Sequence, residues 1–474
     1  MDWAVRIKGF KAPQTSKFRY LELGCGQGFG LNLIAALYPD SDFVGVDFNP
    51  QHIAHARDLA AAAGLTNVRF EEADFMALSR NWPYGQFHFV VLHGIYSWVS
   101  ETLRGAICSC LDQALLSGAL AYVSYNAMPG WISALPLQKL LQRHQIARGL
   151  SPLPAIDQGF AFMDQLSSSG AALFNALPQL AKRMEETVKK DKSYLIQEYL
   201  HENWHPLWFS QVCAEMERAK LSFAGSATLP ENYLPTLLPE QMRALVMAYD
   251  DPTFSQELID CLINQAFRRD LFQRGLYKPW TANQNQGLLQ SRFVLIKPPK
   301  DYQFKTTFGE VNAKPEIYQP IIDALADGPK SVAELGQTPT STIQALTLLL
   351  HNGSVGIEAP QAETRKALAF NQVVARAAAQ GAPYTELASA NTACGIAAGT
   401  PSLMLLNALA EHTPATPEAM GQALAKQLSA IGRQLVKDGQ PLTEPAQVQA
   451  EAVKQAQEFL ETTLPLYKRL GVWE

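Results

Sequence analysis

The sequence predicts an α/β protein with a doubly wound parallel sheet, and two observations lead to this fold class. Short apolar runs of strand length alternate with helical segments through roughly the first 126 residues, as in parallel strands joined by helices. A Gly-rich turn follows the first apolar run and opens the first helix. Backbone N–H groups at such a turn face a ligand, so the turn also marks a candidate binding site.

The elements of this first domain follow in order along the chain. Strands are predicted at residues 18–23, 42–46, 68–71, 87–92 and 119–125, and helices at 30–37, 50–63 and 103–116. Residues 87–92 (FHFVVL) are nearly all apolar, as expected for a strand buried on both faces. Gly64 is a plausible C-cap of the second helix. We place this core domain at residues 1–135.

The next segments change pattern. Residues 136–219 have helical periodicity and predict an insertion that serves as a cap, a dimer contact or a substrate site. A strand is predicted at 220–229, and its partner is either 267–273 or 292–297. Residues 220–300 are therefore expected to return the chain to the core sheet as an antiparallel edge.

The C-terminal part predicts two further units. Helical segments at 317–326, 331–335 and 341–351, then a turn and a short strand at 355–358, predict a winged-helix-like domain at 301–365. Its third helix has no Lys or Arg for DNA phosphates, so we expect it to pack against protein. Residues 366–474 are predicted to form a helical domain. The uncharged stretch 387–410 is expected to be buried in that domain or against a partner.

Composition limits the classes of function. The 474 residues include 39 Lys and Arg and 44 Asp and Glu, a net charge of −5, which offers no basic footprint for nucleic acid. The six cysteines form no Cys-x-x-Cys pair, and no apolar run approaches the roughly 18 residues of a membrane helix. With no secretory signal, these features predict a cytoplasmic protein without a metal, a nucleic-acid partner or membrane insertion.

Acidic residues end three successive strands of the predicted sheet. Glu22 ends the first strand, Asp47 the second, and Asp74 follows the third, at the sheet edge where ligands bind. Asp47, with Phe48 beside it, suits the two hydroxyls of a ribose, and Asp74 with Phe75 suits an adenine. Glu22 disfavours a pyrophosphate but suits an ammonium and a sulfonium. Together these residues predict S-adenosylmethionine as the ligand.

The Gly-rich turn supports this choice of cofactor. Gly24, Gly26 and Gly28 are assigned to cofactor binding. The dinucleotide fingerprint requires Gly at the sixth position from Gly24, where this chain has Phe29. The P-loop reading also fails, because no Gly-Lys-Ser/Thr follows.

The loop after the fourth strand supplies His93, Tyr96 and Trp98. His93 is a candidate base or a residue that lines the cofactor. Tyr96 is assigned to catalysis and substrate binding, and the Tyr96 and Trp98 rings could form an aromatic wall for an amine. The alternative is that both rings pack against the following helix.

The loop after the fifth strand supplies Tyr125, Asn126 and Trp131. Tyr125 and Asn126 end a parallel strand and are assigned to catalysis. Tyr125 and Trp131 are assigned to substrate contact, although Trp131 could simply pack. The chain lacks the Asn/Asp-Pro-Pro-Tyr motif after the fourth strand, which counts against a nucleic-acid base as acceptor.

These motifs resemble the class I methyltransferases over roughly residues 18–126. The resemblance rests on the E-x-G-x-G-x-G turn and the acid that ends the second strand. It implies a Rossmann-like, seven-stranded sheet and transfer of the methyl group of S-adenosylmethionine to a nucleophile by in-line displacement. Such catalysis positions the nucleophile and excludes water.

A narrower resemblance covers most of the chain up to about residue 360. The segments FRYLELGCGQG, VGVDFNPQHI, LHGIYSWVS and YVSYNAMPGW resemble bacterial methyltransferases with a methyltransferase regulatory domain, similar to outer-membrane-protein lysine methyltransferases. Further matches are residues 194–200, 206–209 and 267–270. The resemblance implies a protein lysine as the acceptor, and a homodimer.

Three functions remain open from the sequence. A protein lysine methyltransferase is favoured, a small-molecule methyltransferase is second, and a non-catalytic S-adenosylmethionine-binding regulatory protein is third. Lysine has a pKa near 10.4 and reacts only as the neutral amine, so the site must desolvate it or accept its proton. Tyr96, Tyr125 and His93 are the candidates for this role.

Overall fold

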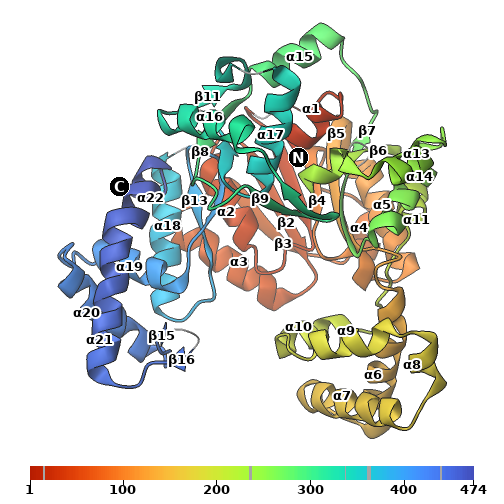
Figure 1. Cartoon of the computed structure of the whole chain (residues 1–474), viewed down its shortest axis with the longest axis horizontal. Helices are drawn as coiled ribbons and strands as arrows, with labels where there is room; N and C mark the ends of the chain where they lie inside the picture. Colours follow the sequence, from red (N-terminus) through yellow and green to blue (C-terminus); the bar gives the residue numbers. More distant parts are fainter. Residues whose placement is uncertain (14–15, 234–236, 337, 360–363, 438–439) are drawn as a thin grey trace.

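The computed structural model describes residues 1–13, 16–233, 237–336, 338–359, 364–437 and 440–474. Its centre is a seven-stranded sheet of strand order β3-β2-β1-β4-β5-β7-β6 (Figure 1). Strands β1 to β5 pair in parallel, and β7 runs antiparallel to both β5 and β6. The strands are β1 Arg19–Leu23, β2 Asp42–Asp47, β3 Val68–Glu72, β4 Phe87–Leu92, β5 Leu115–Asn126, β6 Leu221–Ser226 and β7 Phe267–Arg274.

The sheet confirms the predicted α/β class and decides between the two proposed edge partners. The partner of β6 is β7, which contains residues 267–273. The other candidate, residues 292–297, contains β8 (Arg292–Leu295), which belongs to a separate three-stranded sheet. The mostly parallel core is therefore completed by the chain segment after the insertion.

Helices cover both faces of the sheet because successive strand residues point to opposite sides. Phe43 packs in one core cluster with α2 (Phe29–Leu37) and α3 (Pro50–Ala62). Val44 and Val46 pack in the other cluster, with α5 (Glu101–Ala114). Two more helices belong to this second face, α4 Phe75–Arg80 and α11 Phe209–Glu217. Because α11 packs on the sheet, it is part of the core and not of the predicted insertion.

The insertion forms a helical unit with a core of its own. It begins where β5 ends and lies at the lower right of Figure 1. Leu141, Phe160 and Met163 are among the side chains of its separate cluster. Its helices are α6 Leu135–Arg148, α7 Pro152–Ser168, α8 Ala172–Ala176, α9 Gln179–Thr187 and α10 Lys192–Tyr199. The unit thus leaves the sheet at the edge where parallel strands end.

The segment predicted to be winged-helix-like differs from that pattern. Its second helix is one 3-10 turn, η4 (Val332–Leu335). Among the described residues, strand β12 (Val355–Ile357) pairs with β8, which precedes the helices of this unit, and not with a strand that follows it. The third helix is largely buried, and the Trp3 indole of α1 (Asp2–Ile7) donates to Thr347 of that helix at 3.0 Å. The other elements here are β9 Gln303–Thr306, β10 Gly309–Asn312, α16 Pro315–Ala326, β11 Lys330–Ser331 and α17 Pro339–His351.

The C-terminal domain is not wholly helical. The uncharged segment 387–410 folds as a hairpin and a helix, and Leu387, Leu403 and Leu406 within it are fully buried. They share a core cluster with α2, which packs on the seven-stranded sheet. The elements are α18 Thr364–Ala379, β13 Glu386–Ser389, β14 Cys394–Ala397, α19 Thr400–Ala410, α20 Pro417–Ala430, β15 Val436–Lys437, β16 Gln440–Pro441, α21 Pro445–Glu458, η5 Phe459–Thr463 and α22 Leu464–Arg469.

Short elements complete the chain. They are η1 Tyr96–Trp98, η2 Ile132–Ala134, η3 Leu229–Tyr233, α13 Glu240–Met247, α14 Pro252–Ile263 and α15 Thr281–Leu289. Within the part of the chain that the structure describes, no helix combines the length and apolar character needed to cross a membrane.

Candidate functional site

The Gly-rich turn folds back onto β2. The N–H groups of Gly24 and Cys25 both donate to the Val46 carbonyl, at 2.7 and 3.0 Å. Gly24, Gly26 and Gly28 have positive φ angles of 76°, 54° and 69°, a conformation that L side chains rarely adopt. Gly28 is also the N-cap of α2. The three glycines therefore allow a tight turn that ends at the positive pole of a helix.

The space around each glycine differs. A Cβ atom at Gly24 would stand 2.4 Å from Cδ1 of Ile95, and one at Gly28 would stand 2.5 Å from Cβ of Ala56. A Cβ at Gly26 would have no neighbour within 4 Å. Gly24 and Gly28 are thus required by packing. Gly26 faces open space, which is where a bound cofactor can approach the backbone.

Asp47 ties the turn to the end of β2. Its Oδ2 accepts the Gly26 N–H at 2.9 Å, and its Oδ1 accepts the Asn49 N–H at 2.9 Å and lies 3.3 Å from Nδ1 of His52. The Asp47 carboxylate is nearly buried at 6% exposure, whereas the adjacent Phe48 is 76% exposed. The structure therefore brings Asp47 and Gly26 together, with an open aromatic ring beside them.

Glu22 lies one strand away, opposite Gly45 on β2 and Val91 on β4. Burial raises the pKa of its carboxyl group to about 8. A buried acid of this kind is mainly neutral at pH 7 and ionises when a cation approaches it. Glu22 thus fits a ligand with an ammonium or sulfonium group, and with Asp47 and the open space at Gly26 it makes a site that fits S-adenosylmethionine.

Asp74 is exposed and Phe75 is partly buried. The Asp74 side chain is the N-cap of α4, and its Oδ1 accepts the N–H groups of Met76 and Ala77 at 2.7 and 3.1 Å. Phe75 is partly buried against the core of the second face. Contact of these two residues with adenine remains a prediction.

His93 is exposed at the end of β4, next to two polar residues of β5. Its Nδ1 lies 3.1 Å from the Tyr122 hydroxyl and 3.4 Å from the Ser124 hydroxyl. Partial desolvation, and then the charge of Arg269, lower the pKa of His93 and favour its neutral form. Sequence reasoning missed Tyr122 and Ser124, although their i, i+2 spacing puts both on one face of β5.

The Tyr96 hydroxyl does not lie at the edge of the sheet formed by the C-terminal ends of the parallel strands. Its side chain is fully buried, and its hydroxyl donates to the Glu215 carboxylate of α11. Arg104 also donates to Glu215, at 3.1 Å. Burial raises the pKa of Tyr96 far above its ordinary value. This placement fits the alternative that Tyr96 packs, and it does not bring the hydroxyl to a substrate.

Tyr125 is buried in the same way. Its hydroxyl donates to Asp270 Oδ2 at 2.6 Å, and Asp270 pairs with Arg268 at 2.8 Å. Arg268 also pairs with Asp260, at 2.6 Å. The residues 267–270, noted in the sequence as a family match, thus build a buried ion network that joins β7 to β5. Neither tyrosine is placed to accept a proton from a substrate.

Asn126 and Trp131 link the sheet to the insertion. The Asn126 Nδ2 donates to Glu198 Oε1 at 2.8 Å, and the Trp204 indole donates to the same oxygen at 2.8 Å. Trp131 is buried and donates to the Ala266 carbonyl at 2.7 Å. Trp98 is only partly buried, and it packs against the apolar core of the insertion. Of the predicted substrate contacts, Trp98 is therefore the least enclosed.

No group of three His, Cys, Asp or Glu side chains is arranged to hold a metal ion among the residues that the structure describes.

Comparisons with known proteins identify two family matches and a full-length relative. Residues 14–130 match the family described as "Methyltransferase domain", and residues 191–274 match "Predicted methyltransferase regulatory domain". "Uncharacterized protein sll1526" of Synechocystis is 34% identical over 480 residues, which cover 98% of this chain and 94% of that protein.

Solved structures show the same fold over the whole chain. PKMT2 from Rickettsia typhi has a TM-score of 0.67 at 17% identity, and covers 100% of this chain and 98% of its own. The structure of its complex with AdoHcy has a TM-score of 0.68 at 18% identity, with the same coverage of both chains.

The fold and the site define a class I S-adenosylmethionine-dependent methyltransferase. Within this class, the chain belongs to the family that carries a methyltransferase regulatory domain.

Proposed function

We propose that this enzyme transfers methyl groups to lysine side chains of proteins. The observation that carries the proposal is the agreement with PKMT2 over the whole chain, at a TM-score of 0.67. PKMT2 is a protein lysine methyltransferase of Rickettsia. The agreement includes the insertion and the C-terminal domain, which a small class I methyltransferase does not need for its chemistry.

Three features of the described site support cofactor binding in this proposal. Bound S-adenosylmethionine supplies an electrophilic methyl group. Asp47 holds the ribose hydroxyls, and the open face of the turn at Gly26 admits the cofactor against the backbone. Glu22 ionises to balance the positive charge of the cofactor, because the cation removes much of the cost of its burial.

His93 is the proton acceptor in the proposed reaction. Its lowered pKa keeps the imidazole neutral, as a base requires. When Nδ1–H donates to the Tyr122 hydroxyl oxygen at 3.1 Å, Nε2 keeps its lone pair for the proton of the lysine ammonium. His93 is preferred over Tyr96 and Tyr125, whose hydroxyls are buried in bonds to Glu215 and Asp270.

The insertion has a proposed role as a cap over the acceptor. It starts at the end of β5 and is tied to Asn126 through Glu198, so it lies beside the edge of the sheet that binds the cofactor. The partly buried Trp98 ring is proposed to line the route of the lysine chain.

The experiment uses the full-length protein with radiolabelled S-adenosylmethionine and fractionated bacterial extract. We expect label in the macromolecular fraction, released by protease and not by nuclease, and recovered as methyllysine after hydrolysis. Label confined to small molecules would instead identify the protein as a small-molecule methyltransferase. Cofactor binding without any labelled product would favour a regulatory protein.

Two variants at opposite ends of β2 provide the control. Asp47→Ala removes the acceptor of the Gly26 N–H and should abolish both cofactor binding and labelling. Asp42→Ala removes an exposed carboxylate at the start of the same strand and should leave both intact. Equal loss in both variants would contradict the placement of the site.

A further inference from the structure

The C-terminal domain packs on the helix that starts at the Gly-rich turn. α18 and β13 lie against α2, as Figure 1 shows and as their residue contacts confirm. The apolar core is continuous across this contact. Lys366 of α18 also donates to the Gly64 carbonyl after α3, at 2.8 Å. The domain is therefore docked by many groups at once.

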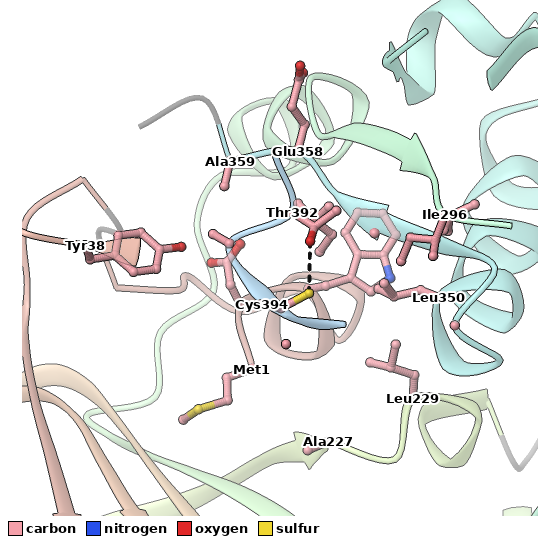
Figure 2. A pocket seen from close by; sticks show the side chains of 18 residues that line it. Met1, Tyr38, Ala227, Leu229, Ile296, Leu350, Glu358, Ala359, Thr392 and Cys394 are labelled. Carbon is pink, nitrogen blue, oxygen red and sulfur yellow. Dashed lines mark hydrogen bonds between the residues drawn. The ribbon is translucent and has the colours of Figure 1, made fainter. Parts of the chain in front are cut away.

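The contact runs along the whole of α2. At its C-terminal end, Tyr38 borders a cavity of about 740 Å³. Figure 2 shows Cys394 and Thr392 of the β13–β14 hairpin on the wall of this cavity, joined by a contact of 3.1 Å between their side chains. At the N-terminal end of α2, Phe370 and Tyr384 of this domain both lie against Phe29, and Tyr384 also leads to the turn itself.

The ring of Tyr384 stacks on Phe29. The ring centroids are 4.6 Å apart, and the planes are inclined by 18°. Phe29 is the first residue of α2 and directly follows its N-cap, Gly28. It is also the residue that replaces the glycine of the dinucleotide fingerprint. In this chain, that position serves as the stacking partner of a residue from the C-terminal domain.

The hydroxyl of Tyr384 continues the contact to the turn. It lies 3.2 Å from Nε2 of His55, and Nδ1 of His55 lies 3.0 Å from the Gln27 carbonyl oxygen. A carbonyl oxygen can only accept, so Nδ1 must carry the proton. In the neutral ring, Nε2 then accepts from the Tyr384 hydroxyl. The sequence of contacts ends on the backbone between Gly26 and Gly28.

We propose that Tyr384 is a positioning residue for S-adenosylmethionine binding, acting through His55 and Phe29. It fixes the Gln27 carbonyl and the start of α2, so the Gly26 N–H stays aligned on Asp47. Without it, the turn must be ordered when the cofactor binds, and that cost lowers the affinity. The proposal rests on the cofactor site at this turn. It adds that cofactor affinity is set in part by the C-terminal domain.

The test measures S-adenosylmethionine affinity by calorimetry in the full-length protein. Tyr384→Phe removes the hydroxyl but keeps the ring, and His55→Ala removes the connection to Gln27. Each should raise the Kd about three- to tenfold, as expected for one lost hydrogen bond. The double variant should bind no more weakly than His55→Ala, since the hydroxyl acts through the imidazole.

The matched control is Tyr467→Phe. Tyr467 is a buried tyrosine of the same domain, and its hydroxyl donates to the Ala397 carbonyl at 3.3 Å and not to a residue of the turn. This variant should bind within about twofold of wild type, because its lost bond does not touch the turn. Thermal unfolding of each variant checks that the domain remains folded.

Two results would separate the failure of this inference from failure of the site. Wild-type affinity in Tyr384→Phe, or additive losses in the double variant, would overturn the role of Tyr384 while leaving the cofactor site in place. A wild-type protein that does not bind S-adenosylmethionine would contradict the site itself.

Discussion

The Asn126 side chain donates a 2.8 Å hydrogen bond to Glu198, and this contact joins the end of β5 to α10 of the insertion. The Trp204 indole donates to the same carboxylate oxygen, also at 2.8 Å. All three side chains are buried. Glu198 thus helps to hold the insertion against the sheet, because one of its oxygens accepts from both Asn126 and Trp204.

Glu198→Ala should loosen this connection. The variant leaves the Asn126 amide and the Trp204 indole without their buried acceptor, which costs about 1–3 kcal/mol for such groups. Urea unfolding should show a decrease of this size in the free energy of unfolding. Glu202→Ala removes an exposed acid in the same segment and should change stability by less than about 0.5 kcal/mol. Equal losses in the two variants would mean that the bond does not bear on stability.

Glu22 should make cofactor binding depend on pH. Its pKa of about 8 means that the free protein holds a proton there at pH 6, and a cationic ligand must displace it. The affinity for S-adenosylmethionine should therefore rise as pH rises towards 8, by up to roughly tenfold per pH unit. Binding measured from pH 6 to 9 tests this. Glu22→Gln should bind weakly, with a much flatter profile, and the same slope in both proteins would assign the titration elsewhere.

Glu22 should also make stability depend on pH. Its folded pKa lies above the value near 4.3 of an unfolded chain, so the folded state binds the proton more tightly. The contribution of protonated Glu22 to the free energy of unfolding is fully present below about pH 4 and is lost as pH rises through 8. Glu22→Gln removes this loss, so its unfolding midpoint should exceed that of wild type increasingly from pH 5 to 8. The exposed Glu72→Gln should follow wild type at every pH.

Gly26 and Gly28 should respond differently to the same substitution. Gly26→Val puts a side chain into the open space that the cofactor is proposed to occupy, so it should lower cofactor affinity at least about tenfold. The positive φ of this position also costs about 1–2 kcal/mol of stability for any L side chain. Gly28→Val has the same backbone cost, but its Cβ would also stand 2.5 Å from Ala56 and 2.7 Å from Phe70. Gly28→Val should therefore lose clearly more stability in thermal unfolding. If Gly26→Val binds normally, the cofactor does not approach the turn at that point.

The sequence predicted the core sheet and the acids at its edge because both are local properties. An apolar run followed by Gly or Asp is enough to place Glu22 and Asp47 at strand ends. The orientation of Tyr96 and Tyr125 could not be predicted in this way. Their partners, Glu215 and Asp270, lie 119 and 145 residues further along the chain. Which of several polar residues near a strand end is enclosed depends on these distant elements.

The C-terminal part shows the same limit. The Ala-rich sequence after residue 366 favours helix, yet residues 386–397 form a hairpin, in which Leu387, Ala388 and Ile396 are buried in the same core as α2. Burial on this scale outweighs local propensity. The contact from Tyr384 to His55 spans 329 residues. No spacing rule would reveal it.

The position of β7 has a consequence for synthesis on the ribosome. β5 ends at Asn126, and its neighbour in the sheet begins at Phe267, about 140 residues later. At roughly 5–20 residues per second, the unpaired side of β5 stays without that neighbour for roughly 7 to 30 seconds. An open strand edge is a template for pairing with other chains. The nascent enzyme is therefore most in need of a chaperone during the interval in which its insertion is being made.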